Sequence, residues 1–244
     1  MACHPEGNAI KPEAIIFDVD GTLADTEQNG HLPACNEALA ALNYPIRWSW
    51  DTYRWLTEHF SGTEARLRHS LSQHYPALPP AQIETAVAQL ADRKRQIYLQ
   101  KYVAKIPLRP GIAAIVSEAI TRQIPMAIVT VSHEAQVLAL LQNQLPHATD
   151  YFQPVLGKQA GPKTAPDSPL YRRCLAELGT DPAKTLVIED SAGGLQAART
   201  AGLPCAVFYN DCTFGQDFSG AALVARSIEF FTLAQLARLC FAAG

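Results

Sequence analysis

The sequence predicts an α/β protein with a doubly wound parallel sheet and a group of helices inserted after the first strand. Three short apolar runs, at 14–17, 126–129 and 186–188, predict the sheet. Runs of this length without polar alternation are typical of strands buried on both faces of a parallel sheet. After residue 111, amphipathic helical patterns alternate with these runs, which predicts helices on both sides of the sheet.

Helical patterns fill the long interval between the first run and the second. Apolar residues recur at helical spacing from Ile83 to Tyr98, and no strand pattern stands out in this interval. We therefore expect two domains: an α/β catalytic core made of residues 1–26 and 106–244, and a helical cap domain at 27–105.

The remaining core elements follow at regular intervals. We expect helices at 112–120, 137–141, 170–178 and 192–201, and a further strand at 205–208. Gly179 and Gly202 follow two of these helices, at the position where a helix commonly ends. The order of helices and strands predicts a doubly wound core.

The bulk composition excludes several classes of function. The chain has 244 residues, 48% of them hydrophobic, and a formal net charge of -3. Because it has no strongly basic segment and no long apolar stretch, we expect neither nucleic acid nor a membrane as a partner. The six cysteines lack CxxC spacing, which favours reduced thiols. We expect a cytoplasmic protein without a secretion signal, and a monomer.

Two carboxylates follow the first apolar run directly. Asp18 comes at its end and Asp20 two residues later, and ligands of parallel sheets bind beyond the carboxyl ends of the strands. A carboxylate such as Asp18 can attack phosphorus and form an aspartyl-phosphate. Asp20 can protonate the leaving oxygen and later accept a proton from water. The alternative is a polar strand exit without chemistry, but the whole string at 18–27 is more specific than a bare DxD.

A second acidic pair, Glu189 and Asp190, closes the third run. Carboxylates near Asp18 repel one another unless a cation lies among them, and Mg²⁺ prefers oxygen ligands and retains several waters. We expect Asp190 to bind the metal directly and Glu189 to bind it through water. The alternative for this pair is capping of the helix that follows.

Two further segments offer groups for a phosphate. Thr130 ends the second run, and its hydroxyl and the amides of Val131 and Ser132 are candidates to bind phosphate oxygens. Lys163 is the lysine of the loop at 161–169, where it can neutralise negative charge that gathers during phosphoryl transfer. The alternative for such a lysine is a solvated surface position.

These elements, in this order, resemble the haloacid dehalogenase superfamily of phosphatases and mutases. The segment from Glu189 to Gly202 is similar to the family's EDSxxGxxAAxxAG string. The resemblance implies a Rossmann-like core, with Asp18 as the nucleophile and Asp20 as the acid/base. It further implies that Asp18, the backbone carbonyl of Asp20, and Asp190 hold Mg²⁺.

Within the superfamily, the chain is similar to the branch with a helical cap after the first strand, which includes β-phosphoglucomutase and the CbbY-like sugar-phosphate phosphatases. The segment 25–31, followed by Asn36, matches the CbbY-like pattern DTE-x-x-GH…N. This resemblance implies substrate contacts for Glu27 and His31, and xylulose-1,5-bisphosphate as a candidate substrate. Glu27 can equally be a carboxylate of the cap hinge.

The cap differs from the family at its phosphate-binding turn, GGKER. Thr63 replaces the lysine of this turn, Ala65 replaces its arginine, and Arg66 lies one place further on. This loss of cations weakens the case for a bisphosphate, whose second phosphate needs a clamp. The candidate cap contacts are Gly62, Thr63, Arg66 and Arg95. Arg95 belongs to a basic run that can instead be a solvated helix face.

The function predicted from the sequence is a Mg²⁺-dependent phosphatase that hydrolyses a small sugar phosphate. A phosphomutase of the β-phosphoglucomutase type is the alternative, and the sequence does not separate the two. A dehalogenase is disfavoured because halide release needs no leaving-group acid such as Asp20. A catalytically idle binding protein is disfavoured because all the motif residues are present.

Overall fold

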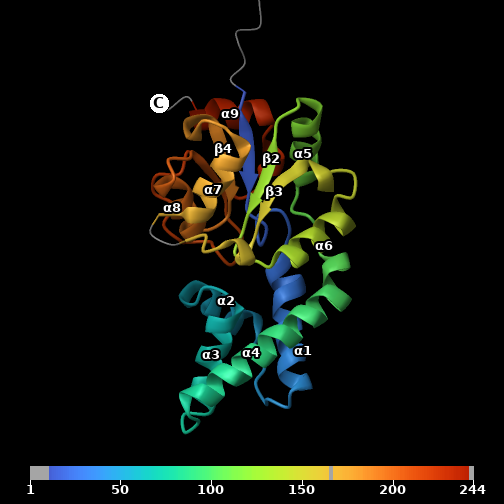
Figure 1. The fold of residues 1–244 in the computed structure, drawn as a ribbon, viewed down its shortest axis with the longest axis vertical. Helices are drawn as coiled ribbons and strands as arrows, with labels where there is room; N and C mark the ends of the chain where they lie inside the picture. The colour runs from blue at the N-terminus through green and yellow to red at the C-terminus, as the bar shows by residue number, and fades with distance from the viewer. Residues whose placement is uncertain (1–10, 165–166, 242–244) are drawn as a thin grey trace, which may run out of the picture.

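A parallel six-stranded sheet forms the centre of the computed structural model, which describes residues 11–164 and 167–241 (Figure 1). The strand order is β3-β2-β1-β4-β5-β6, which confirms the predicted doubly wound α/β fold. The strands are β1 (Ala14–Phe17), β2 (Met126–Val129), β3 (Phe152–Leu156), β4 (Thr185–Glu189), β5 (Cys205–Phe208) and β6 (Leu223–Ala225).

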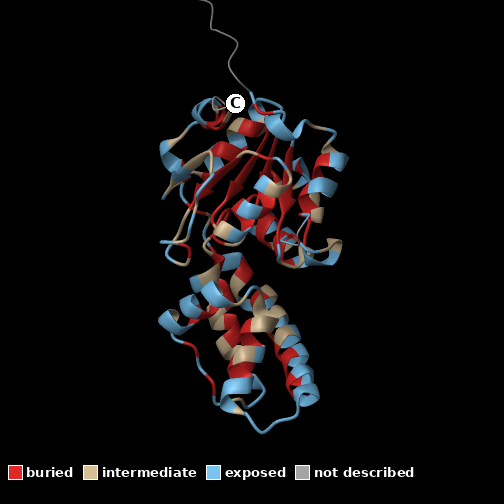
Figure 2. Ribbon diagram, turned by 90° about the vertical axis from the view of Figure 1, so that its left-hand side faces the viewer, coloured by how far each residue is buried: buried red, intermediate tan, exposed pale blue. Residues whose placement is uncertain are grey.

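Helices cover both faces of this sheet. They are α5 (Ile112–Thr121), α6 (Glu134–Gln144), α7 (Pro169–Leu178), α8 (Ala192–Thr200) and α9 (Leu233–Phe241). Side chains alternate along β1, so Ile15 and Phe17 pack with residues of α5, α6 and α9, whereas Ile16 packs with residues of α7 and α8. The central strands are therefore buried on both faces, as the continuous apolar runs predicted (Figure 2).

The sheet has its topological switch between β1 and β4. β1 pairs with β2 on one side and with β4 on the other, so successive strands are added in opposite directions from it. Ligands of such sheets bind in the crevice beyond the strand ends at this point. Residues that follow β1 and β4 therefore lie together at one edge.

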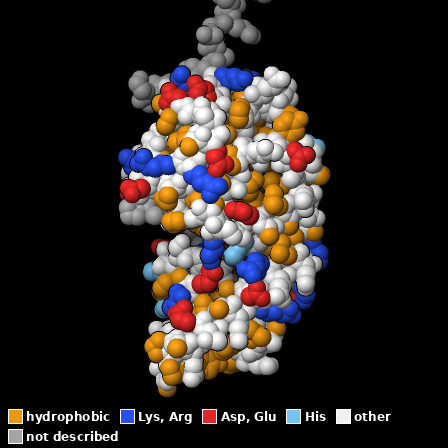
Figure 3. Space-filling view, in the orientation of Figure 1, with side chains coloured by type: hydrophobic (Ala, Val, Ile, Leu, Met, Phe, Trp, Pro, Cys, Tyr) orange, Lys and Arg blue, Asp and Glu red, His pale blue; other side chains and the backbone are white. Residues whose placement is uncertain are grey.

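Four α-helices between β1 and α5 in the sequence lie beyond the carboxyl ends of the strands (Figure 1). They are α1 (Leu32–Ala41), α2 (Trp50–His59), α3 (Thr63–His74) and α4 (Pro80–Ile97), and a π-helical turn, Glu27–His31, precedes α1. This is the helical cap expected after the first strand; its boundaries at 27 and 105 stay predictions. In the space-filling view, the molecule is notched between the cap and the sheet (Figure 3).

Two hydrogen-bonded segments connect the cap to the core. Ala24 forms an antiparallel bridge with Leu108, and the amide of Asp25 donates to the carbonyl of Pro107 (3.1 Å). Arg109 is 9% exposed and donates to four carbonyls of the core, those of Gly21, Phe208, Tyr209 and Arg226. The point where the chain re-enters the core is therefore fixed to the edge of the sheet.

Two expectations from the sequence concern membrane-spanning helices and the oxidation state of the cysteines. No helix in the described part of the chain has the length and apolar composition to cross a bilayer. Five cysteines are free thiols: Cys35, Cys174, Cys205, Cys212 and Cys240. Cys3 lies outside the described residues. Burial raises the pKa of Cys174 to about 12, so this thiol is unreactive at neutral pH.

Candidate active site

Asp18 lies directly after β1 and is 5% exposed. Lys163 Nζ donates to Asp18 Oδ1 (2.6 Å) and is 2.5 Å from Glu189 Oε1. Burial, together with the nearby carboxylates of Glu189 and Asp20, raises the pKa of Asp18 to about 7 against the opposing charge of Lys163. The loop lysine is thus a buried ion-pair partner of Asp18 and not a solvated surface residue.

Asp20 is held by a chain of hydrogen bonds that reaches into the cap. His31 Nε2 is 2.9 Å from Asp20 Oδ1, and Lys94 Nζ is 3.0 Å from His31 Nδ1. An ammonium group can only donate, so His31 accepts at Nδ1 and donates from Nε2 to Asp20. Ser132 Oγ donates to the other oxygen of Asp20. Although burial opposes the charge, His31 and Ser132 hold the pKa of Asp20 below its usual range, so Asp20 is a carboxylate here.

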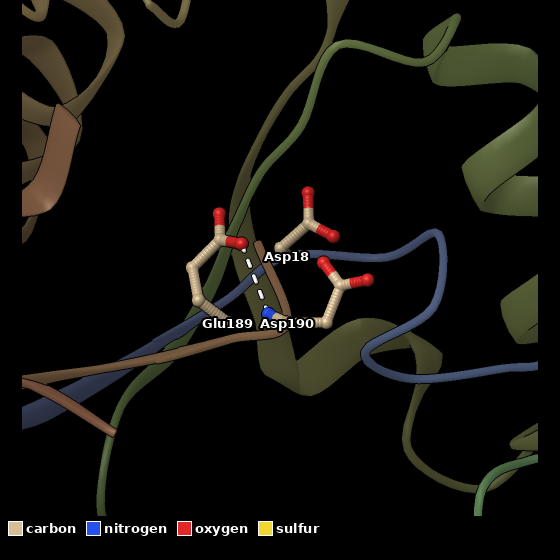
Figure 4. Close-up of side chains that lie close together, drawn as sticks. All are labelled: Asp18, Glu189 and Asp190. Atoms are coloured by element: carbon tan, nitrogen blue, oxygen red, sulfur yellow. Dashed lines mark hydrogen bonds between the residues drawn. The ribbon is translucent and has the colours of Figure 1, made fainter. Parts of the chain in front are cut away.

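Three buried carboxylates, Asp18, Glu189 and Asp190, each have an oxygen within 4.8 Å of the others (Figure 4). Burial, reinforced by Asp18 and Glu189, raises the pKa of Asp190 well above its usual value. Lys163 is the cation paired with this cluster, so full ionisation of its three carboxyl groups needs further positive charge. Closely spaced hard oxygen ligands of this kind fit a divalent cation such as Mg²⁺.

The hydrogen bonds of the cluster distinguish its members as metal ligands. Glu189 is 0% exposed and already contacts Lys163, the Tyr171 hydroxyl (3.3 Å) and the amide of Asp190 (3.1 Å). Asp190 accepts one hydrogen bond, from Asn210 Nδ2 (2.6 Å). Asp18 and Asp190 thus have oxygens available to hold a metal, whereas both oxygens of Glu189 already have partners.

A cavity of about 810 Å³ opens above this cluster, between the sheet edge and the cap. Most of the residues predicted from the sequence line it: Asp18, Asp20, Glu27, His31, Gly62, Thr63, Arg66, Arg95, Val131, Ser132, Lys163 and Asp190. Two predicted residues, Thr130 and Glu189, are fully buried and lie outside the lining. Thr130 Oγ1 accepts a hydrogen bond from the amide of Ser132 (3.2 Å), so it shapes the loop that reaches the cavity.

The cap side of the cavity contains a second set of linked side chains. The Tyr53 hydroxyl donates to Glu27 and accepts from Arg66 Nη1 (2.9 Å). Arg66 is 9% exposed and also lies 3.8 Å from Glu27. Glu27 is therefore fixed at the entrance to the cap.

Comparison with known proteins decides the family. A family model for haloacid dehalogenase-like hydrolases matches residues 12–202. The chain belongs to the haloacid dehalogenase-like hydrolases. The hydrolase is similar to the CbbY protein of Cupriavidus necator (37% identity over 225 residues, 87% of this chain and 84% of the relative). It is also similar to a CBBY-like protein of Arabidopsis thaliana (33% over 218 residues, 87% and 68%).

Solved structures agree with this assignment. CbbY from Rhodobacter sphaeroides in complex with phosphate has a TM-score of 0.74 and 33% identity, covering 89% of this chain and 95% of that one. A mutant of the same CbbY, in complex with xylulose-1,5-bisphosphate, gives the same values. The hydrolase therefore lies in the CbbY-like branch, as the motifs predicted, and is a phosphatase-type enzyme.

Sequence reasoning missed Tyr53 and Asn210 in the site of the hydrolase, and it considered Lys94 only as part of the basic run 93–95. Lys94 had a detectable pattern, because it falls on the apolar face of α4 marked by Leu90 and Ile97. Asn210 follows the end of β5, where polar residues of a parallel sheet are site candidates. Tyr53 carried no such pattern, since a tyrosine at helical spacing is usually a core residue.

We expect Lys94→Met to lower kcat/KM by about 10- to 100-fold, because His31 then loses the donor that fixes its tautomer toward Asp20. The measurement is the pH profile of aryl phosphate hydrolysis. If Lys94 had only a structural role, Lys94→Met would lower the rate without changing the shape of this profile. Arg93→Met is the matched control, since Arg93 is the exposed neighbour on α4. Equal losses in both variants would contradict the role of Lys94.

Proposed function

We propose that the chain is a Mg²⁺-dependent phosphatase that hydrolyses a small sugar phosphate through an aspartyl-phosphate. The observation that carries the proposal is the buried contact of Lys163 with Asp18 beside Asp190, beneath a cavity large enough for a phosphorylated sugar. The similarity to CbbY proteins supports the same activity.

The reaction uses this chain's residues in two steps. Asp20 first accepts a proton from the phosphate monoanion of the substrate. A carboxylate oxygen of Asp18 then attacks phosphorus, and the bond to the sugar oxygen breaks as that oxygen takes this proton from Asp20. Asp20, again a carboxylate, then takes a proton from a water that attacks the aspartyl-phosphate and releases phosphate. The ammonium of Lys163 offsets the negative charge that gathers during both steps.

Asp18, Asp190 and the backbone carbonyl of Asp20 are the residues that would hold Mg²⁺. When bound, the metal supplies positive charge that screens the attacking carboxylate from the phosphate. The chemistry of the cluster fits this ion because its ligands are oxygens and its surroundings are short of cations.

The size of the cavity and the similarity to CbbY proteins support this substrate class. Xylulose-1,5-bisphosphate is the first ester to test, because a CbbY structure of 33% identity contains it. A cytoplasmic location and a monomeric state stay predictions.

We expect phosphate release from 4-nitrophenyl phosphate and from a panel of sugar phosphates to stop when EDTA is added and to return with Mg²⁺. The physical reason is that crowded carboxylates repel a phosphate unless a cation lies among them. Free phosphate is counted against isomerised sugar phosphate, which separates a phosphatase from a phosphomutase. Undiminished turnover in EDTA would contradict the metal requirement.

A further inference from the structure

We propose that the hydrolase selects sugar monophosphates against sugar bisphosphates, because the part of the cavity facing the sugar accepts an uncharged polyol. This inference rests on the proposed function and narrows its substrate class. It concerns the cap wall, which we define as the cavity-lining residues of α2, α3, α4 and the α2–α3 turn.

A second phosphate needs cations that are free to contact it. The described residues that line the cavity include seven carboxylates and five Lys or Arg side chains. One of the five, Lys163, is at the nucleophile and serves the transferred phosphate. The other four, Arg66, Lys94, Arg95 and Lys158, would have to form the second clamp.

Arg66 is directed into the cap. Its Nε donates to the carbonyl of Phe60 (3.1 Å) and its Nη1 donates to the Tyr53 hydroxyl (2.9 Å). Glu27 lies 3.8 Å away and balances the charge. Turning this guanidinium toward a ligand would take its hydrogen bond from the buried Tyr53 hydroxyl and its charge from the partly buried Glu27, which is costly.

The N-terminus of α3 is occupied by a carboxylate of this chain. Gly62, the residue before the helix, offers no side-chain cap, and a helix N-terminus of this kind attracts anions. Glu64 takes that place and pairs with Lys158 across the cavity. Although burial opposes its charge, Lys158 and the helix amide lower the pKa of Glu64, so it is ionised. A second phosphate would have to displace this carboxylate to reach Lys158.

The last two cations of the cavity are also engaged. Arg95 pairs with Asp92 and lies against His133 (3.4 Å), and Lys94 is hydrogen-bonded to His31 and to Thr63 Oγ1 (3.3 Å). Figure 3 also shows acidic and basic side chains interspersed on the surface where the cap meets the core.

The net charge of the cavity also disfavours a second phosphate. A divalent cation at the carboxylate cluster and one phosphate dianion cancel, which leaves a cavity with more acidic than basic side chains. A second dianion would be repelled by this excess, whereas sugar hydroxyls can donate to carboxylates such as Glu58 and Glu64. The cap wall is therefore suited to an uncharged polyol.

The first test compares matched esters with the wild-type enzyme and Mg²⁺: xylulose 1-phosphate against xylulose 1,5-bisphosphate, and glucose 1-phosphate against glucose 1,6-bisphosphate. We expect kcat/KM to be higher for each monophosphate by about tenfold or more. A bisphosphate that is hydrolysed as well as its monophosphate, or better, overturns the inference.

The second test changes the cap wall. Glu64→Gln removes the carboxylate at the α3 N-terminus and frees Lys158, so we expect the preference for monophosphates to fall by about three- to tenfold. Glu58→Gln is the matched control: it removes the same charge from the cap wall without freeing a cation. Equal shifts in both variants, or none in Glu64→Gln, overturn the role assigned to Glu64.

Failure of this inference and failure of the proposed function give different results. Hydrolysis of 4-nitrophenyl phosphate together with a preference for bisphosphates refutes only the selectivity. Absence of phosphate release from every ester refutes the proposed function, and the selectivity with it.

Discussion

Replacing Asp18 with asparagine abolishes phosphate release, by about 10⁴-fold or more, because the amide cannot attack phosphorus. The fold survives the change. Asp18 is one of three crowded buried carboxylates, and Lys163 keeps Glu189 as a partner at 2.5 Å. Without metal, the free energy of unfolding of Asp18→Asn should therefore equal or exceed that of the wild type.

The measurement pairs phosphate release with thermal unfolding of the same samples. Asp25→Asn serves as the control, because its carboxylate lies in the same loop and faces a different cavity. Normal turnover by Asp18→Asn would end the proposal that this residue is the nucleophile. A large fall in melting temperature would instead show that Asp18 stabilises the fold.

Removing Lys163 should damage both activity and stability. Lys163→Met leaves Asp18, Glu189 and Asp190 buried without their cation, and breaking a buried pair in this way costs about 3–5 kcal/mol. Turnover should fall by about 10²- to 10³-fold, because the charge of the transferring group is no longer offset.

Mg²⁺ provides a readout that does not depend on activity. A divalent cation at the carboxylates partly replaces the missing ammonium, so Mg²⁺ should raise the melting temperature of Lys163→Met more than that of the wild type. Lys184→Met, which removes an exposed lysine paired with Glu13, should melt like the wild type. A Lys163→Met protein as stable as the wild type without Mg²⁺ would contradict the buried ion pair.

The strands that the sequence predicted are those with continuous apolar runs, and the two it missed lack them. β3 contains Gln153 and Pro154, and proline within a run argues against a central strand. It lies at the edge of the sheet, where that rule allows proline. β6 is the opposite edge and has three residues, which is too short for a period to be visible.

The site was predictable where the chemistry follows a strand end. Asp18 and Asp190 were found because β1 and β4 end at the same edge of the sheet. Lys94 was harder to find, since it approaches His31 from a helix 63 positions along the chain. The positions of Arg66 and Glu64 depend on how the cap helices pack, which no local pattern determines.

The pairing of the two cap connections has a mechanical consequence. Residues 23–25 and 107–109 are joined by antiparallel hydrogen bonds. The two connections therefore move together as one two-stranded segment and not as two independent linkers. Such a segment flexes readily about one axis and resists twisting. This pairing restrains the orientation of the cap, which keeps Lys94 and His31 aligned with Asp20.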